Sequence, residues 1–493
     1  MIWPAFAARA ERHPDRTAII DGDGVTLTYG GLQAEAEALA RALPALGIAR
    51  GDRVAWLGQN EAAELALLLA CARCGAVLLP LNWRLATPEL RYILDHAEAR
   101  LVFAQPAMMA LAMAATPAGC RVVDSAAPLP ADELAAPTGL ADDALLLVYT
   151  SGTTGRPKGA VLTQAAVAAN AENARAVFDL TEADRILTVL PMFHVGALNI
   201  QTVPALLSGA AVILHPGFDA DAFLDACAAQ RPTLSLLVPT VMRMLVTHPR
   251  WQTADLSTLR AIGAGSSEVP VALIEIFHAR GIPVQQVYGA TETAPIAIAQ
   301  TRAEALAAPG SIGRAAALCE ARIQDAAGNP LPPGQAGEIA IRGPNVMREY
   351  WKARAATADA LRDGWFRTGD AGRMDEAGRF WFTDRIKHVI ISGGENIYPA
   401  EVERVLLTAP GVAEGAVCGR ADARWGEVPV AVVVPGEGFD RAAVLHHFEG
   451  RLARFKHPRD VVAVPALPRT ALGKVQVPEL RALAARGRGG GAG

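Results

Sequence analysis

Residues 149–159 (YTSGTTGRPKG) have the composition of a phosphate-binding loop, with four Ser/Thr residues, three glycines and one lysine. Glycine lets the backbone approach a ligand closely, and hydroxyls with exposed N–H groups can surround phosphate oxygens. Lys158 adds a mobile positive charge. The spacing is not that of a Walker A loop, because two residues separate Gly155 from Lys158 and a glycine follows the lysine. We therefore expect a nucleotide-phosphate loop of another kind, with a solvated Ser/Thr/Gly linker as the alternative.

Two more candidate sites directly follow apolar, strand-like runs. His194 stands in PMFHVG after residues 186–190, and the turn 288–293 (YGATET) follows another such run. A side chain at the carboxyl end of a parallel strand faces the ligand crevice. In the turn, Tyr288 can stack on a flat ring, and Glu292 offers a carboxylate oxygen suited to phosphate-bound Mg²⁺. Taken alone, the histidine is better explained as structural and the turn as an ordinary one.

Three further segments carry weaker signals. Asp370 ends WFRTGD, where its carboxylate can accept hydrogen bonds from both ribose hydroxyls, although Asp after Gly usually only makes a turn. Residues 384–403 pass from dense charge through a buried strand to a Gly-Gly turn, which suits either a linker that absorbs a domain rotation or an ordinary charged loop. Lys474 lies in a glycine-containing loop and by itself resembles any surface lysine.

Short apolar runs alternate with helical stretches through most of the chain. Strands are expected at 54–57, 77–79, 145–148, 186–190, 211–214, 233–238, 258–262 and 284–287, and helices near 61–75, 220–229 and 269–280. This βαβ pattern predicts parallel sheets covered by helices. From about residue 313, short strands between Gly/Pro turns predict antiparallel β-structure. A third unit begins near 384, with strands at 389–391, 412–418 and 428–434 and helices near 399–408 and 441–452.

Size and charge limit the classes of protein that fit. A chain of 493 residues with 51% hydrophobic residues is expected to form two or three domains. A net charge of -4 without a basic stripe argues against a nucleic-acid binder, and no apolar run is long enough to span a bilayer. The first residues lack the pattern of a signal peptide, which favours the cytoplasm. Cys71 and Cys74 form a CxxC in an apolar helical stretch, which indicates buried thiols in preference to a zinc or redox site.

Together and in this order, these segments closely resemble the adenylate-forming superfamily of acyl-CoA synthetases, aryl-CoA ligases, luciferases and peptide-synthetase adenylation domains. The resemblance runs from Thr26 to Lys474, and residues 391–403 (ISGGENIYPAEVE) look most like aryl or feruloyl-type and fatty acyl-CoA ligases. It implies an α/β fold with a large N-terminal domain of parallel sheets at 1–384, a small β-barrel-like part at about 313–384, and a small mobile α+β C-terminal domain at 385–485. The tail 486–493 (RGRGGGAG) is expected to be flexible.

The resemblance also implies roles for the matching residues. The phosphates of ATP would be held by Thr150, Ser151, Gly152, Thr153, Thr154, Gly155 and Lys158. The rest of the nucleotide would lie against Gly265, Ser266, Tyr288, Gly289, Asp370 and Arg385, and Mg²⁺ against Thr150 and Glu292. The catalytic groups would be Lys474, His194, Thr291 and Glu292, with Lys387 as the hinge and Gly393 and Gly394 at the CoA tunnel. The acyl pocket would be formed by His194, Val195, Gly196, Gly263, Ala264 and Ala290.

The implied function is that of an ATP-dependent acid:CoA ligase that uses ATP, Mg²⁺ and coenzyme A. The carboxylate of a small-molecule acid attacks the α-phosphate, pyrophosphate leaves, and the thiol of CoA then displaces AMP from the acyl-AMP. Positive charge from Mg²⁺ and Lys474 offsets the repulsion between the two anions. Because Lys474 serves only the first step, the C-terminal domain is expected to swing about Lys387 between the steps.

The identity of the acid and of the acyl acceptor stays open at this level. Small and apolar residues near His194 and Gly263 favour an aromatic acid of the benzoate or hydroxycinnamate type, followed by medium- to long-chain fatty acids. Arg243 either meets a second carboxylate or, as is commoner on a helix, extends to solvent. The alternatives are a stand-alone adenylation enzyme that loads a carrier protein and a non-catalytic nucleotide-binding relative; a homodimer is left open. Two departures from the family pattern, Ala290 in place of Met and His388 in place of an acidic residue, remove no catalytic group.

Overall fold

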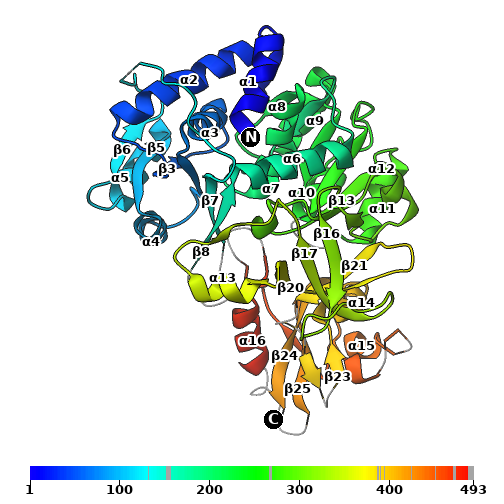
Figure 1. Ribbon diagram of the computed structural model, residues 1–493. Helices are drawn as coiled ribbons and strands as arrows, with labels where there is room; N and C mark the ends of the chain where they lie inside the picture. The colour runs from blue at the N-terminus through cyan, green and yellow to red at the C-terminus, as the bar shows by residue number, and fades with distance from the viewer. Residues whose placement is uncertain are drawn as a thin grey trace. The chain divides into compact units, whose positions relative to one another are not determined.

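The computed structural model divides into two compact units (Figure 1). The residues that it describes are 1–130, 133–150, 157–265, 269–385, 388, 390–392, 395–422, 425–449, 451–452, 454–469 and 474–486. The first unit comprises Met1–Arg322, Ala340–Thr368 and Ala377–Phe380, and the second comprises Ile323–Ile339, Gly369–Glu376 and Trp381–Gly493.

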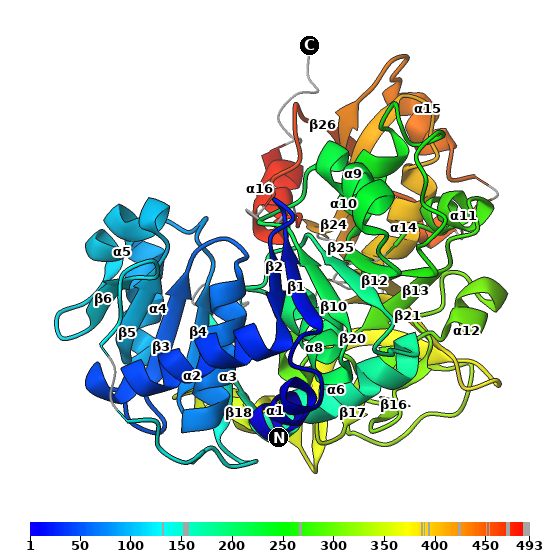
Figure 2. The same ribbon diagram turned by 90° about the horizontal axis from the view of Figure 1, so that it is seen from above.

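One half of the first unit is a seven-stranded sheet with the strand order β18-β8-β7-β4-β3-β5-β6. Its strands are β3 (Arg53–Leu57), β4 (Val77–Leu81), β5 (Ala99–Ala104), β6 (Arg121–Asp124), β7 (Ala144–Thr150), β8 (Lys158–Thr163) and β18 (Glu349–Tyr350). Strands β7 to β6 in that order are parallel, whereas β8 and β18 pair antiparallel. Every residue of β4 is buried, as expected for a strand covered on both faces. In Figures 1 and 2 the helices on one face are α2 (Tyr29–Ala45) and α3 (Ala62–Cys74), and those on the other are α4 (Thr87–Ala97) and α5 (Met109–Ala115).

The other half is a nine-stranded sheet with the order β15-β14-β13-β12-β11-β9-β10-β1-β2. Its strands are β1 (Thr17–Asp21), β2 (Thr26–Thr28), β9 (Arg185–Thr188), β10 (Ala211–Leu214), β11 (Leu234–Leu237), β12 (Ala261–Gly265), β13 (Val284–Tyr288), β14 (Ile298–Ala299) and β15 (Arg314–Ala315). Strands β13 to β1 in that order are parallel, and the outer strands pair antiparallel. The carboxyl ends of the parallel strands therefore meet at one edge, which is where ligands bind in such sheets.

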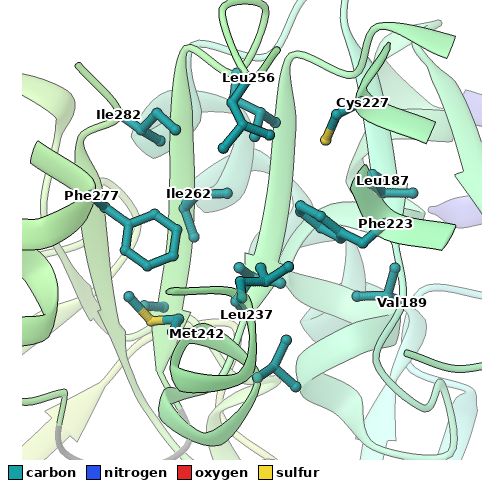
Figure 3. Close-up of a cluster of buried hydrophobic side chains, with 14 of the residues drawn as sticks. Leu187, Val189, Phe223, Cys227, Leu237, Met242, Leu256, Ile262, Phe277 and Ile282 are labelled. Carbon is teal, nitrogen blue, oxygen red and sulfur yellow. The ribbon is translucent and has the colours of Figure 1, made fainter. Parts of the chain in front are cut away.

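Successive side chains of β12 pack on opposite faces of this sheet. The helices beside it include α9 (Ala220–Gln230), α10 (Pro239–Val246) and α11 (Val271–Ala279), and on the other side α6 (Gln164–Phe178) and α8 (Val203–Ser208). Ile262 and Ala264 belong to a buried hydrophobic cluster that includes Phe277 of α11, which Figure 3 shows beside Ile262. Gly263 faces the opposite side, toward Phe178 at the end of α6.

The remaining strands form two five-stranded sheets. One has the order β16-β17-β20-β19 with β21 beside β20, and its strands are β16 (Glu320–Gln324), β17 (Ala336–Arg342), β19 (Leu361–Arg362), β20 (Trp365–Met374) and β21 (Phe380–Arg385). The other lies in the second unit and has the order β23-β22-β25-β24 with β26 beside β25. It consists of β22 (Ile390–Ser392), β23 (Glu395–Ile397), β24 (Val412–Asp422), β25 (Gly426–Pro435) and β26 (Asp460–Ala463). The helices of this unit are α14 (Pro399–Leu406), α15 (Arg441–His446) and α16 (Val477–Arg486).

The predicted α/β class is confirmed, with parallel sheets in the large unit and a separate C-terminal unit. The strand expected at 211–214 is found unchanged as β10. By contrast, β12 begins at Ala261 and not at 258, because a turn closed by the Leu259 N–H and the Leu256 carbonyl precedes it. Two segments expected in the N-terminal domain, Ile323–Ile339 and Gly369–Glu376, group with the second unit.

Helix α3 holds the CxxC cysteines as structural thiols. Cys71 is buried, and burial raises the pKa of its thiol. The thiol of Cys74 lies 3.8 Å from the Ala40 carbonyl oxygen. In the described part of the chain there is no group of three potential metal-ligating side chains, and no helix has both the length and the apolar character needed to cross a membrane.

A buried carboxyl group lies in the first turn of α3. Glu64 is 1% exposed, and its Oε1 atom has no hydrogen-bond partner among the described residues. Burial, with a smaller contribution from the charge of Glu61, raises the pKa of Glu64 from 4.5 to about 8. The folded protein therefore keeps this proton over a pH range in which the unfolded chain has lost it, so stability falls as the pH rises through this range.

Glu64→Gln should remove this loss, because glutamine has a similar shape and does not ionise. We expect the unfolding free energy of the variant, relative to the natural protein, to rise by roughly 3 kcal/mol between about pH 6 and about pH 8, at about 1.4 kcal/mol per pH unit. Urea unfolding at several pH values measures the difference. The matched control is Glu61→Gln at the exposed neighbour, which should leave most of the pH dependence in place. If the difference in unfolding free energy between Glu64→Gln and the natural protein did not change with pH, the raised pKa of Glu64 would be contradicted.

Candidate functional site

Tyr350 links two of the predicted phosphate-binding elements. It lies in β18 opposite Ala160 of β8. Its hydroxyl donates to the Glu292 carboxylate at 2.6 Å, and the Lys158 ammonium lies 5.3 Å from its ring centroid. One side chain thereby brings the cation at the start of β8 next to the carboxylate of the 3₁₀ turn η3 (Thr291–Thr293).

The segment before Tyr350 also fixes the backbone around Glu292. The Met347 N–H donates to the Glu292 carbonyl at 2.7 Å, and the side-chain amide of the buried Asn345 donates to the Thr293 carbonyl at 2.7 Å. Glu292 is 8% exposed, so its carboxylate is largely shielded from water. A single shielded carboxylate fits Mg²⁺, which proteins usually bind through one or two carboxylates together with substrate phosphates.

The two ends of the phosphate loop are paired strands. Thr150 of β7 stands opposite Lys158 of β8, with the Thr150 Oγ1 3.5 Å from the Lys158 carbonyl oxygen. Just before them, His96 Nδ1 lies 2.7 Å from the Tyr149 hydroxyl. Burial raises the pKa of Tyr149 and lowers the pKa of His96, which favours the neutral form of both groups. Neither His96 nor Tyr149 therefore carries a charge that would offset the positive charge of Lys158.

The turn after β13 requires glycine because backbone atoms approach it closely. A Cβ at Gly289 would lie 1.6 Å from the Pro295 carbonyl oxygen, and one at Gly265 would lie 2.4 Å from the Val287 carbonyl oxygen. Tyr288 is half-buried at the carboxyl end of its strand. An aromatic ring flanked by bare backbone leaves room for a flat ring to stack on it.

A buried asparagine holds the loop that leads to His194. Asn60, after β3, is 7% exposed and donates to the carbonyls of Leu190 at 2.9 Å and His215 at 3.0 Å. Its side-chain oxygen accepts from the Met192 N–H at 2.8 Å. His194 itself is half-buried. These bonds join the seven-stranded sheet to the edge of the nine-stranded sheet, where the ligand crevice is expected.

A second buried asparagine connects the helix after His194 with the segment after Glu292. Asn170 of α6 donates to the Asn199 carbonyl at 2.6 Å and accepts from the Ile296 N–H at 2.8 Å. Asn199 lies in η2 (Leu198–Thr202), a π-helical turn. The segment after His194 and the segment after Glu292 are thereby both bonded to α6.

The residues predicted for the acyl pocket do not all face the same space. Helix α7 (Val195–Ala197) carries Gly196 directly after His194. Gly263 faces α6, whereas the side chain of Ala264 lies in the hydrophobic cluster on the opposite face of the sheet. This separation follows from the alternation of side chains along a strand. Ala290 is half-buried in the turn before η3.

The second unit contains Asp370 and a buried network behind it. Asp370 is 7% exposed in β20. The Gly369 N–H donates to Glu338 Oε1 at 3.1 Å, and Gln324 donates to the other oxygen of Glu338 at 3.2 Å. This network fixes the backbone of β20 next to Asp370.

The other groups of the second unit include Asp384 near the end of β21 and two residues between named elements, His388 and Lys474. Asp384 accepts from the Ala400 N–H at 2.8 Å, which orients the start of α14, and His388 Nδ1 lies 4.0 Å from the other Asp384 oxygen. Lys474 is exposed, one residue before the Val475 end of a β-bridge with Arg469.

Some of the predicted site residues lie close together in the structure, and others lie outside the residues that it describes. In the first unit it assembles Thr150, Lys158 and Glu292 on one side and places Gly265, Tyr288 and Gly289 at neighbouring strand ends. The predicted positions outside the described residues are Ser151, Gly152, Thr153, Thr154, Gly155, Ser266, Lys387, Gly393 and Gly394, and Arg385 is described in its backbone alone.

The chain is similar to known proteins in both sequence and structure. Two family models match, AMP-binding enzyme over residues 6–351 and AMP-binding enzyme C-terminal domain over residues 401–474. The chain is 50% identical over 481 residues to an indoleacetate–CoA ligase of Aromatoleum aromaticum, covering 93% of this chain and 94% of the relative. It is 44% identical over 488 residues to a feruloyl-CoA synthase of an Amycolatopsis species, covering 97% and 98%. O-succinylbenzoate coenzyme A synthetase of Bacillus subtilis, solved in complex with ATP and magnesium ion, matches with a TM-score of 0.88 at 31% identity and covers 97% of this chain and 99% of that one.

Gly289→Ala tests the close backbone approach after β13. Because the added methyl would meet the Pro295 carbonyl, we expect a loss of stability on the order of 3 kcal/mol or more in urea unfolding. The matched control is Gly217→Ala, since a Cβ at Gly217 meets nothing within 4 Å. Equal stability of the two variants would show that the turn does not need glycine.

Proposed function

This chain belongs to the AMP-binding enzyme family, and on that premise we propose that it is an ATP-dependent, AMP-forming acid:CoA ligase that acts on an aromatic acid. The observation that carries the proposal is the grouping of Lys158, Tyr350 and Glu292 beside the carboxyl end of β13. A lysine and a carboxylate held around one aromatic ring suit the phosphates of ATP and their cation. The family match to both parts of the chain supports a reaction that uses both units.

Glu292 is the residue that we propose to hold Mg²⁺, with the Thr150 hydroxyl as a further oxygen ligand. When bound, the ion would neutralise phosphate charge. Tyr350 positions the Glu292 carboxylate through its hydroxyl and leaves the second carboxylate oxygen to the metal. The solved relative with ATP and magnesium ion supports this assignment.

In the first step the acid carboxylate attacks the α-phosphate, and pyrophosphate leaves. Lys158 and the Thr/Ser/Gly loop bind the leaving phosphates, and Thr291 lies next to Glu292, where it can donate to the α-phosphate. Lys474 brings a positive charge to the carboxylate and the α-phosphate, which must approach each other although both are anionic.

In the second step the CoA thiol attacks the acyl carbon, and AMP leaves. No pair of anions has to be joined at this stage, so Lys474 has no role in it. We therefore propose that the C-terminal part rotates about Lys387 between the two steps and presents Gly393 and Gly394 to the pantetheine arm. We place the enzyme in the cytoplasm, where ATP and CoA are both present.

The acid that we propose is aromatic. The relatives named above act on indoleacetate and ferulate, and the surroundings of Gly263 are apolar, with Phe178 and Leu236 against it. Arg243 is exposed on α10, which favours the interpretation that it extends to solvent over a role in binding a second carboxylate.

A panel of aromatic and fatty acids, incubated with ATP, Mg²⁺ and CoA, tests the proposal by the acyl-CoA that forms. Formation of acyl-CoA from arylacetates or hydroxycinnamates supports it, and a preference for long-chain fatty acids would overturn the aromatic assignment. Release of pyrophosphate without acyl-CoA would point instead to loading of a carrier protein.

Tyr350→Phe should weaken metal binding while it keeps the ring beside Lys158. We expect the affinity for Mn²⁺ in the presence of a non-hydrolysable ATP analogue to fall about tenfold, because groups that orient a metal ligand usually contribute that much. Calorimetric titration gives the value. Tyr29→Phe is the control: it also removes a buried hydroxyl, which donates to Ala210 at 2.8 Å in another part of the unit, and should leave the titration unchanged. Equal metal affinity in Tyr350→Phe and the natural protein would refute the positioning role.

Lys474→Ala should separate the two half-reactions. We expect acid-dependent ATP–pyrophosphate exchange to fall by roughly a hundredfold or more, since a charge at the reacting groups is lost. Thioester formation from supplied acyl-AMP should persist. Lys456→Ala, at a lysine paired with Glu401 at 2.7 Å, serves as the control for loss of a lysine in the same unit. Equal losses in both half-reactions would contradict the alternating use of Lys474.

A further inference from the structure

Gln201 is a buried carboxamide whose hydrogen-bonding groups are unused. It is 1% exposed, and neither its Oε1 nor its Nε2 has a partner among the described residues. Leaving a buried amide unpaired costs free energy, and most such groups in proteins are paired. An unpaired amide at this depth therefore needs a reason.

The other buried glutamines of the described structure each donate a hydrogen bond to a protein acceptor. The acceptors are Ala72 for Gln164, Val177 and Gln300 for Gln285, Ser311 for Gln286, Ala308 for Gln300 and Glu338 for Gln324. Gln201 differs from these glutamines because its Nε2 donates to no described acceptor; its Oε1 also has no partner, as is true of the Oε1 atoms of Gln164 and Gln285. The fold is thus able to pair buried glutamines and does not do so here.

The backbone at Gln201 has an unusual helical turn. Residues 198–202 form the π-helix η2, in which the Val203 N–H donates to the Leu198 carbonyl and the Thr202 hydroxyl donates to the Ala197 carbonyl at 2.7 Å. Such turns are frequent at functional sites. In a π-turn, residues five apart stack on each other, so Gln201 follows Gly196 on the same side of the helix. Gly196 lies two residues after His194 and has no side chain.

The amide of Gln201 lies over Gly263 of β12. A Cβ at Gly263 would be 3.1 Å from Gln201 Nε2, with Phe178 and Leu236 at 3.2 Å. Gly263 precedes Gly265 by two residues, which places it roughly 7 Å further from the carboxyl end of the strand. Gln201 is thus a polar group beside the apolar side chains of Phe178 and Leu236, further than Gly265 from the carboxyl end of β12, where the nucleotide is proposed to bind.

We propose that Gln201 is a specificity-determining residue that hydrogen-bonds a ring N–H or O–H at the end of the acid remote from its carboxylate. The inference rests on the proposed function and narrows its substrate to aromatic acids with such a donor. An acid with a purely hydrocarbon ring or chain leaves the amide unpaired when it binds. Sites of this kind strongly reject analogues that lack the hydrogen-bonding group, whereas apolar walls discriminate weakly.

The test compares acids that differ in the donor alone. Indole-3-acetate is paired with benzothiophene-3-acetate, in which sulfur replaces N–H, and 4-hydroxycinnamate is paired with 4-methylcinnamate, in which a methyl replaces the hydroxyl. We expect kcat/KM for acyl-CoA formation to favour the donor-bearing acid of at least one pair by roughly tenfold or more. The pair that shows the preference tells whether N–H or O–H is recognised.

Gln201→Met has a similar shape and no amide. We expect the ratio of kcat/KM between the two acids of that pair to fall to about one. The main cause should be a higher activity toward the acid without the donor. Because both acids are measured on the same protein, a general loss of activity or stability cancels from the ratio. Gln164→Met removes a buried glutamine of α6 outside the crevice and should leave the ratio as in the natural protein.

Two outcomes would overturn the inference. One is a kcat/KM ratio near one for both pairs of acids in the natural protein. This measurement does not depend on whether a variant folds. The other is an unchanged ratio in Gln201→Met. Failure of the proposed function itself looks different, because then neither acid of either pair yields acyl-CoA with the natural protein.

Discussion

The hydrogen bond from Tyr350 to Glu292 joins the two sheets on which the phosphate site depends. Tyr350 extends the seven-stranded sheet through β18, and Glu292 follows β13 of the nine-stranded sheet. In the proposed mechanism, Lys158 and Glu292 act on the same phosphates although they come from different sheets. Their distance therefore depends on side chains that cross from one sheet to the other, and Asn60 adds a second such link through its bonds to Leu190 and His215. Fully satisfied buried polar groups of this kind are rigid, which suits a site that has to hold charges in place.

The periodicity of the sequence predicts the strands well because each parallel strand is an apolar run between helices, as in β4 and β10. It also marks the glycines, since the crowding at Gly289 and Gly265 leaves no room for another residue. The role of Tyr350 could not be predicted from such patterns. Its strand has two residues, and its partner Glu292 is 58 positions away, so no local pattern connects them. Asn170 and Asn173 are similar: in an alanine-rich helix they resemble surface residues, and only their spacing of three on an otherwise apolar face hinted at burial.

The acyl side shows a different limit of sequence reasoning. The small residues Gly196 and Gly263 predict an acyl pocket with little bulk, but the sequence does not reveal which neighbours face them. Strand alternation turns Ala264 into the hydrophobic cluster, and the π-turn shifts the residues after Leu198 by one position relative to an α-helix. Gln201 therefore faces β12 for a reason that a helical projection of the sequence does not contain.

The proposed site has a half for the nucleotide and a half for the acyl group, and the two depend on different interactions. The nucleotide half works by charge and backbone approach, so it needs the same few groups whichever acid is activated. In the proposed acyl half, apolar walls such as Phe178 and Leu236 would distinguish acids mainly by size, because an extra or missing methylene changes binding by only about 1–3 kcal/mol. A single buried amide changes this balance, because an acid without a matching group leaves it unpaired in the bound state as well. Selectivity for the acid then depends less on the shape of the pocket than on one polar side chain, placed where the walls are otherwise apolar.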